Sequence, residues 1–143
     1  MNKGKVLITG AGGFIGHHLV KYLKWMGYWI RGVYIKHPEF EDTFADEFII
    51  SDLRRWENCL KVTGGMEQIY HLAANMGGIG FIETHKAEIV HDNSLININM
   101  LEASRVNNID KFLFTSSACV YPKYKQDSPD TSPLREEDAY PVD

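Results

Sequence analysis

The sequence predicts an α/β fold in which a doubly wound parallel sheet is covered by helices on both faces. Two observations support this prediction. Short apolar runs typical of strands alternate along the chain with amphipathic segments typical of helices. A glycine-rich turn also lies between the first strand and the first helix, at residues 10–16. Because strand–helix–strand units cross over in the right-handed sense, we expect the strand order 3-2-1-4-5.

The expected elements follow one another along the chain. Residues 6–9 predict the first strand, residues 14–26 have the spacing of an amphipathic helix, and Gly27 is suited to end that helix. The same reasoning predicts the remaining strands and helices: strands at 29–35, 48–51, 69–73 and 111–116, and helices at 54–63 and from about 83 to 106. Prolines become frequent after Tyr121. We therefore divide the chain into a dinucleotide-binding domain of Rossmann type, residues 1–121, and a proline-rich loop or tail, residues 122–143.

Composition excludes several classes of function. The 143 residues, 44% of them hydrophobic, can form the core of one globular unit. A net charge of −4 with scattered Lys and Arg argues against nucleic acid or an anionic membrane as partner. No apolar run has the length of a membrane span or the layout of a signal peptide, so we expect a cytoplasmic protein. The two cysteines, Cys59 and Cys119, fit a reducing compartment and predict no metal site.

The glycine-rich turn carries the first functional prediction. Gly10, Gly13 and Gly16 have the spacing G-x-x-G-x-x-G. Each glycine removes a side chain that would block the turn, a phosphate or the contact between helix and strand, and the free N–H groups of the helix start face the phosphate. The alternative is a tight turn without a ligand. Because strand and helix patterns flank the motif, we interpret it as a pyrophosphate site, with Phe14 and Ile15 in the first helical turn.

Residues that follow the other strands should line the same crevice, because ligands of such sheets bind at the carboxyl ends of the strands. Asp52 and Leu53 follow the third strand. The Asp52 carboxylate is placed either to accept a hydrogen bond from an adenine amino group or to cap the next helix, and both roles can hold together. The residues after the fourth strand are mostly small and would let a cofactor lie close to the backbone: Leu72, Ala73 and Ala74.

These motifs together resemble the extended short-chain dehydrogenase/reductase family, specifically its NAD-dependent epimerases and dehydratases, and within it most closely the GDP-mannose 3,5-epimerases. The resemblance covers essentially the whole chain. It rests on the glycine motif, Asp52 with Leu53, residues 72–74, Asn93 with residues 97–103, and two more specific runs at 76–82 and 116–122.

The resemblance implies a function. Enzymes of this type use NAD to oxidise C4 of a nucleotide sugar such as GDP-mannose transiently, exchange protons at C3 and C5, and reduce the ketone again. It implies that Cys119 is the acid/base and that Ser117 hydrogen-bonds a sugar hydroxyl; the alternative for Cys119 is a small buried core residue. The implied substrate-binding residues are Gly77, Gly78, Ser117, Ala118 and Cys119. The implied cofactor-binding residues are Gly10, Gly13, Phe14, Ile15, Gly16, Tyr34, Asp52, Leu53, Leu72, Ala73, Ala74 and Asn93.

Three departures from the family pattern modify this expectation. Tyr34 stands where the family has a carboxylate for the adenosine ribose, so we expect weaker NAD binding, and Arg31 and Lys36 are candidates to favour a 2′-phosphate. Asn75 stands where relatives often carry Asp. The family's Tyr-x-x-x-Lys pair and its substrate domain are expected beyond Asp143. We expect no such pair within the chain and interpret the spacing in segment 121–125 as wrong for it.

From these departures we interpret the chain as the N-terminal part of an epimerase that is inactive by itself. The alternative is a stand-alone, non-catalytic Rossmann domain that binds a nucleotide or a protein partner. The long helix is apolar on more than one side, so part of it should be exposed and we expect a homo-oligomer. The apolar residues concerned are Ile89, Val90, Leu95, Ile96, Ile98, Met100, Leu101 and Val106.

Overall fold

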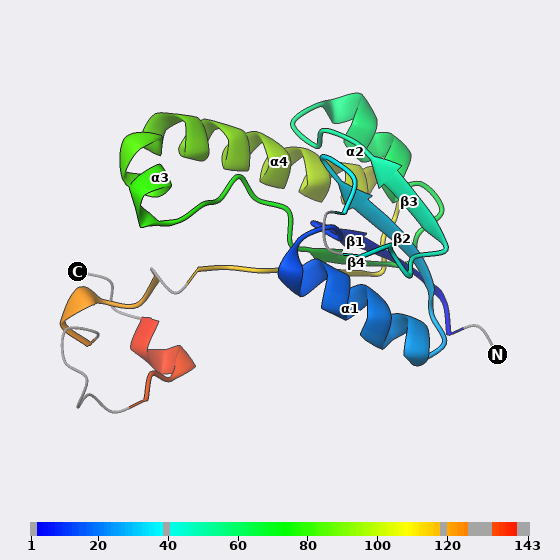
Figure 1. Cartoon of the computed structure of the whole chain (residues 1–143), viewed down its shortest axis with the longest axis horizontal. Helices are drawn as coiled ribbons and strands as arrows, with labels where there is room; N and C mark the ends of the chain where they lie inside the picture. The colour runs from blue at the N-terminus through cyan, green and yellow to red at the C-terminus, as the bar shows by residue number, and fades with distance from the viewer. Residues whose placement is uncertain (1–2, 39–40, 118–119, 126–132, 140–143) are drawn as a thin grey trace.

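The computed structural model describes residues 3–38, 41–117, 120–125 and 133–139, and its centre is a five-stranded parallel sheet (Figure 1). The strands are β1 (Lys5–Thr9), β2 (Trp29–Tyr34), β3 (Glu47–Ile50), β4 (Gln68–His71) and β5 (Lys111–Phe114). They pair in the order β3-β2-β1-β4-β5, every pair parallel. This confirms the predicted fold class and strand order.

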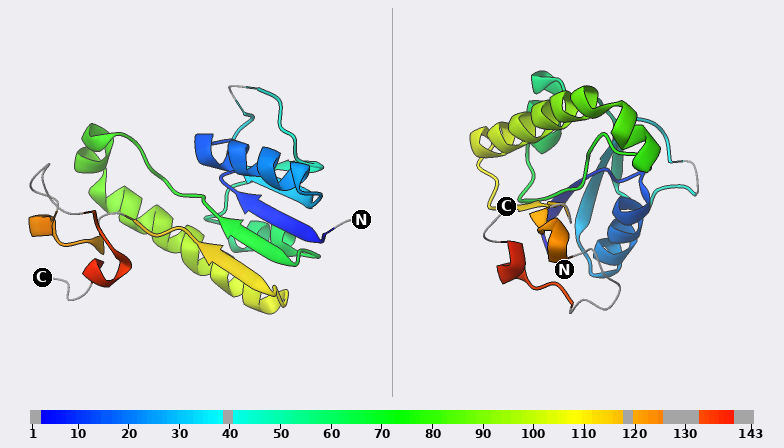
Figure 2. Two further views of the ribbon diagram at one scale, coloured as in Figure 1. Left: turned by 90° about the horizontal axis from the view of Figure 1, so that it is seen from below. Right: turned by 90° about the vertical axis from the view of Figure 1, so that its left-hand side faces the viewer.

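Helices cover the sheet on both faces. Helix α1 (Phe14–Trp25) lies on one face, and α2 (Trp56–Thr63) and α4 (Lys86–Val106) lie together on the other (Figure 2). Successive strand residues point to opposite faces, so Leu7 belongs to the core beneath α2 and α4, whereas Val6 and Ile8 belong to the core beneath α1. The central strand β1 is therefore buried from both sides.

The end of α1 follows the prediction made for Gly27. This glycine has a φ of +91°, and its N–H donates to the Lys24 carbonyl at 2.9 Å. The N–H of Tyr28 donates to the Leu23 carbonyl at 3.1 Å, which completes the hydrogen-bond pattern of a Schellman helix end. The chain can then turn directly into β2.

The long helix expected at about residues 83–106 is in fact two helices, so that prediction is wrong in its first part. A short helix, α3 (Ile79–Thr84), occupies most of the run at residues 76–82, and His85 has a non-helical backbone before α4 begins. Side-chain contacts hold this junction, because the His85 ring stacks on Phe81 at 4.3 Å and the Thr84 hydroxyl donates to the Gly80 carbonyl at 2.8 Å. Helix α3 and the first turns of α4 extend beyond the carboxyl edge of the sheet (Figure 1).

The apolar residues of α4 divide between core and surface. Ile96 and Met100 are buried under the sheet, whereas Val90, Ile98 and Leu101 are 60–67% exposed. This confirms that part of the apolar surface of the helix is exposed. No helix in the part of the chain that the structure describes is long and apolar enough to cross a membrane. The proposed division of the chain at residue 121 stays a prediction; the described residues beyond it include two short 3-10 helices, Lys123–Lys125 and Glu136–Ala139.

Met100 provides a direct test of the core. Its side chain is fully buried against the sheet, so Met100→Ala should lower the free energy of unfolding by about 2–5 kcal/mol through lost burial and a cavity. Met76 is 62% exposed, and Met76→Ala is the matched control. It should change the free energy of unfolding by less than about 0.5 kcal/mol. Urea unfolding measures both, and equal losses would contradict the proposed position of Met100.

Candidate cofactor and substrate site

The glycine loop joins β1 to α1, and two of its glycines are required by close contacts with the backbone. Gly10 has a φ of +72°, and a Cβ there would lie 3.0 Å from the Leu72 carbonyl. A Cβ at Gly16 would overlap the carbonyl of Gly10, so only glycine lets α1 approach the strand this closely. Gly13 directly precedes α1, and its N–H donates to the Gly10 carbonyl at 3.0 Å. The loop is therefore drawn tightly around the end of β1.

The first turn of α1 faces the space in front of this loop. The N–H groups of Phe14, Ile15 and Gly16 have no acceptor within the helix, because a helix lacks one for its first amides. The side chains of Phe14 and Ile15 are exposed. Backbone donors at a helix N-terminus, next to glycines that a side chain could not replace, are the geometry that binds a pyrophosphate. The motif thus has the form that the sequence predicts.

A buried chain of hydrogen bonds supports the loop from beneath. The Thr9 hydroxyl oxygen accepts the N–H groups of Leu72 and Ala73, both at 3.1 Å, so its hydrogen donates to His71 Nδ1 at 2.9 Å. His71 Nε2–H then donates to the Asn97 side-chain oxygen at 3.0 Å. Burial lowers the pKa of His71, which keeps the ring neutral in this role. Sequence reasoning missed Thr9 and His71; a polar side chain at the buried end of each central strand was the available signal.

Two adjoining clefts open at the carboxyl edge of the sheet, with volumes of about 330 and about 610 Å³. Gly10, Ala73, Ala74 and Met76 line both, so the clefts form one continuous trough. Every predicted cofactor-binding residue lines one or both. The larger cleft is lined by Gly10, Gly13, Phe14, Ile15, Gly16, Leu72, Ala73, Ala74 and Asn93, and the smaller by Gly10, Tyr34, Asp52, Leu53, Ala73 and Ala74.

The predicted substrate residues are distributed differently. Ser117 lines the larger cleft together with the glycine loop. Gly77 and Gly78 are exposed and lie in the segment that leads into α3, outside the described lining of either cleft. A Cβ at Gly78 would meet no atom within 4 Å, whereas one at Gly77 would lie 2.8 Å from the Phe81 ring. Ala118 and Cys119 lie outside the described residues.

Tyr34 lies at the end of β2 and its ring covers part of the glycine loop. A Cβ at Gly12 would overlap this ring, so Gly12 is required here by the tyrosine. Sequence reasoning did not assign a role to Gly12, because its partner lies on another strand. The phenol thus occupies the rim of the smaller cleft, where the family places its ribose-binding carboxylate.

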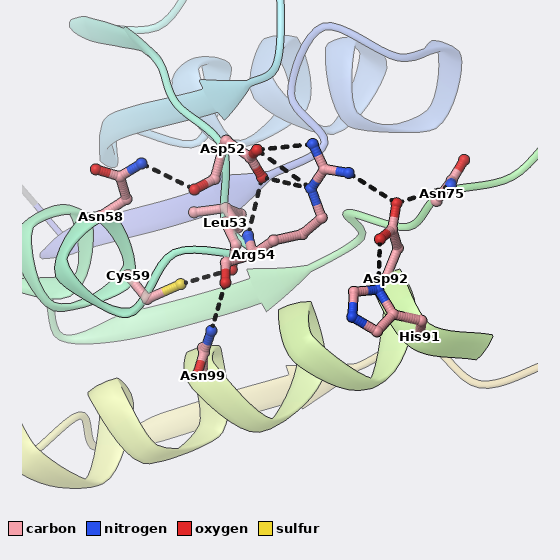
Figure 3. A network of polar contacts seen from close by, with 9 residues as sticks. All are labelled: Asp52, Leu53, Arg54, Asn58, Cys59, Asn75, His91, Asp92 and Asn99. Carbon is pink, nitrogen blue, oxygen red and sulfur yellow. Dashed lines mark hydrogen bonds and ion pairs between the residues drawn. The ribbon is translucent and has the colours of Figure 1, made fainter. Parts of the chain in front are cut away.

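Arg54 connects two carboxylates at the smaller cleft (Figure 3). Its Nη2 donates to Asp52 at 2.8 Å, its Nη1 donates to Asp92 at 2.9 Å, and its backbone N–H also bonds the Asp52 carboxylate at 3.0 Å. Hydrogen bonds from Arg54 lower the pKa of Asp52. Asp52 therefore forms a turn with Arg54 and does not cap α2, which begins at Trp56 after Arg55. The helix-cap alternative for Asp52 was wrong.

Asp92 is almost completely buried on α4 and has further partners. His91 Nδ1 lies 3.0 Å from the Asp92 carboxylate, and the Asn75 side-chain amide donates to it at 3.1 Å. The hydrogen bond with His91, followed by the Arg54 charge, lowers the pKa of Asp92. Asn93 accepts the backbone N–H of Asn75 at 2.6 Å and donates to its carbonyl at 3.1 Å, so it fastens the loop after β4 while also lining the larger cleft.

Arg31 lies elsewhere. Its guanidinium donates to Glu47 at 2.6 Å and to the carbonyls of Val62 and Gly64 at 2.8 and 2.9 Å. It therefore ties β2 to β3 and to the end of α2. The expectation that Arg31 favours a 2′-phosphate was wrong, because these partners draw the side chain away from the cleft.

The expectation that segment 121–125 has the wrong spacing was wrong, because Tyr121 and Lys125 are four residues apart, as in the tyrosine–lysine pair of the family. The two residues nevertheless do not reproduce that pair. Pro122 follows Tyr121 directly, and proline is unsuited to a helix interior. Lys125 forms an ion pair with Asp138, and this hydrogen bond raises the pKa of its ammonium group. The lysine is thus committed to a carboxylate of its own segment.

Comparison with known proteins identifies the family. A model of the NAD dependent epimerase/dehydratase family matches residues 6–143. The chain belongs to this family. NAD is therefore the cofactor, as the sequence predicts, and the glycine cradle and trough fit it. The chain is 46% identical over 141 residues to the GDP-mannose 3,5-epimerase of Arabidopsis thaliana, which covers 97% of this chain and 37% of the relative.

Further relatives and solved structures support the same family. GDP-mannose 3,5-epimerase 1 of Oryza sativa subsp. japonica is 46% identical over 143 residues, 99% of this chain and 38% of the relative. A solved UDP-galactose 4-epimerase superposes with a TM-score of 0.77 at 27% identity, over 96% of this chain and 45% of that chain. MoeE5 in complex with UDP-glucose and NAD gives 0.72 at 30% identity, over 82% and 38%. The chain thus spans less than two fifths of the length of these two epimerases from plants.

Tyr34 generates a prediction about cofactor affinity. A carboxylate at this position can accept paired hydrogen bonds from the ribose hydroxyls, so Tyr34→Asp should tighten NAD binding by about 1–3 kcal/mol. Calorimetric titration measures the affinity for NAD. Tyr22→Asp, on the exposed side of α1, is the control that should leave this affinity unaltered. Equal affinity in Tyr34→Asp and the unmodified chain would show that position 34 does not face the ribose.

Proposed function

We propose that this chain is the NAD-binding part of a nucleotide-sugar epimerase of the GDP-mannose 3,5-epimerase type. One observation carries the proposal beyond family membership. Ser117 lines the same cleft as the glycine loop and the first turn of α1, and this position supports the proposal that its hydroxyl binds the sugar beside the cofactor. The 46% identity to two GDP-mannose 3,5-epimerases supports this choice of substrate class.

In the proposed reaction, NAD supplies hydride transfer for the oxidation and re-reduction at C4. The glycine loop and the first amides of α1 hold its pyrophosphate, and the neutral Thr9–His71–Asn97 chain keeps the backbone beneath in place. Ser117 hydrogen-bonds a hydroxyl of the sugar. Cys119, assigned on the sequence alone, removes or returns the proton at C3 or C5, which becomes acidic once the neighbouring carbon is a ketone.

The segment that leads into α3 is proposed to contact the sugar nucleotide. Gly78 has open space where a Cβ would stand, which leaves room for a substrate against the backbone. Gly77 has a structural reason as well, since a side chain there would meet the Phe81 ring. Substitution of Gly78 is therefore the cleaner probe of substrate binding.

A second candidate function is a non-catalytic domain that binds a nucleotide or a protein partner. It is favoured by the ion pair of Lys125 with Asp138, which engages the lysine that stands four residues after Tyr121 with another partner. The two candidates differ in whether joining this chain to the remaining portion of a plant GDP-mannose 3,5-epimerase restores turnover. Restored turnover that depends on Cys119 supports the epimerase.

By itself, the 143-residue chain should not turn over GDP-mannose. Loss of a proton-relay group typically costs several orders of magnitude in rate, and the family's relay pair is not reproduced at residues 121–125. Incubation with GDP-mannose and NAD in deuterated water, followed by mass spectrometry, measures exchange at the sugar. Cys119→Ala sets the background, and deuterium incorporation well above that background would contradict the prediction.

We also propose that the chain forms a homo-oligomer through the exposed apolar residues of α4, as the sequence predicts. At micromolar concentration, light scattering should give at least a dimer. Ile98→Glu places a charge in this surface and should shift the chain to a monomer. Trp25→Glu, on the exposed side of α1, is the control that should leave the assembly unchanged. A monomeric unmodified chain would refute this proposal.

A further inference from the structure

We propose that the network of Asp52, Arg54 and Asp92 makes the adenosine cleft selective for a free ribose 2′-hydroxyl, and so for NAD over its 2′-phosphorylated form, NADP. The inference rests on the proposed cofactor-binding role of this chain. It assigns the discrimination to the loop after β3 and to α4, whereas Rossmann folds ordinarily place it in a residue at the end of β2.

The position of the smaller cleft relates it to the ribose. Tyr34 and Ile35, at the end of β2, line it, and this strand end is where Rossmann domains contact the adenosine ribose. Tyr34 has no charge to repel a 2′-phosphate. Discrimination must then come from other groups that line the same cleft.

The charged groups of the cleft provide this discrimination against a 2′-phosphate. Three carboxylates line the cleft, those of Asp52, Glu88 and Asp92, against the one guanidinium of Arg54, which gives the described lining a net charge of −2. A phosphate monoester brings nearly two further negative charges into a partly enclosed space, where the repulsion is stronger than in bulk water. The cleft as a whole therefore opposes a 2′-phosphate.

The guanidinium of Arg54 is the cation in this lining that could attract a 2′-phosphate. Its hydrogen bonds keep it from doing so. Its Nε lies 3.0 and 3.2 Å from the two Asp52 oxygens, Nη2 bonds Asp52 at 2.8 Å, and Nη1 bonds Asp92 at 2.9 Å. To reach a phosphate, the guanidinium would have to leave Asp92, whose side chain is only 7% exposed. A carboxylate left buried without its cation is costly, so the arginine stays with its partners.

Two other cationic side chains, Arg31 and Lys36, lie near the end of β2. Arg31 is bound to Glu47 and to the end of α2, away from the cleft. Lys36 is exposed and follows Ile35, so it is the side chain that a competing explanation would use. If Lys36 bound a 2′-phosphate, the unmodified chain would favour NADP.

The test measures binding of NAD and NADP to the 143-residue chain by calorimetry. The unmodified chain should bind NAD at least about tenfold more tightly, and Asp92→Asn, which keeps the shape but removes one charge, should narrow the ratio about five- to tenfold. Glu102→Gln is the matched control, because it removes a carboxylate of α4 that pairs with Arg105 on the helix surface. That variant should leave the ratio unchanged.

A second variant guards against misfolding of Asp92→Asn. Glu88 lines the cleft and is exposed, so Glu88→Gln should also narrow the ratio without disturbing the core. Equal or tighter binding of NADP by the unmodified chain would overturn the inference, as would a ratio that neither variant changes while NAD still binds. Failure to bind either dinucleotide would instead overturn the proposed function itself, and the inference with it.

Discussion

The close approach of α1 to the end of β1 is the constraint on which the cofactor edge depends. A side chain at Gly16 would overlap the Gly10 carbonyl, so this one contact fixes the start of the helix against the strand. The first amides of α1 then point into the trough without any side chain between them and a ligand. The position of Tyr34 follows from the same arrangement, because its ring rests where Gly12 has no side chain.

One face of α4 holds the rest of this edge together. From successive turns it presents Asp92, Asn93, Asn97 and Asn99, which reach the loop after β3, the loop after β4 and the end of β4 itself. Asn99, for example, donates to the Arg54 carbonyl at 3.0 Å (Figure 3). A polar helix face of this kind positions strand ends that are far apart in sequence, while Ile96 and Met100 of the same helix pack into the core.

The features predicted from the sequence were those that depend on neighbouring residues. The strand order follows from the alternation of elements, and it was confirmed. The place of the glycine loop between β1 and α1 follows from its own spacing and was confirmed too, whereas its binding of a pyrophosphate stays a prediction. The role of Asp52 was predicted only in part. Arg54 also bonds Asp92, and that second carboxylate lies forty residues after Asp52 in the chain. Arg31 was misplaced and the break at His85 was missed, since each depends on contacts that periodicity does not record.

The two polar departures from the family pattern can be understood together through Asp92. A carboxylate at position 75 would stand where the Asn75 amide now donates to Asp92 at 3.1 Å, and two carboxylates at that distance repel one another. A buried Asp92 therefore requires a donor at 75, and Asn is the isosteric choice. Tyr34 likewise leaves β2 without its usual charge, while Asp52 and Asp92 place negative charge on the same cleft from other elements. Arg54 bonds both carboxylates, the half-buried Asp52 at 2.8 Å and the buried Asp92 at 2.9 Å, and so offsets the repulsion between them.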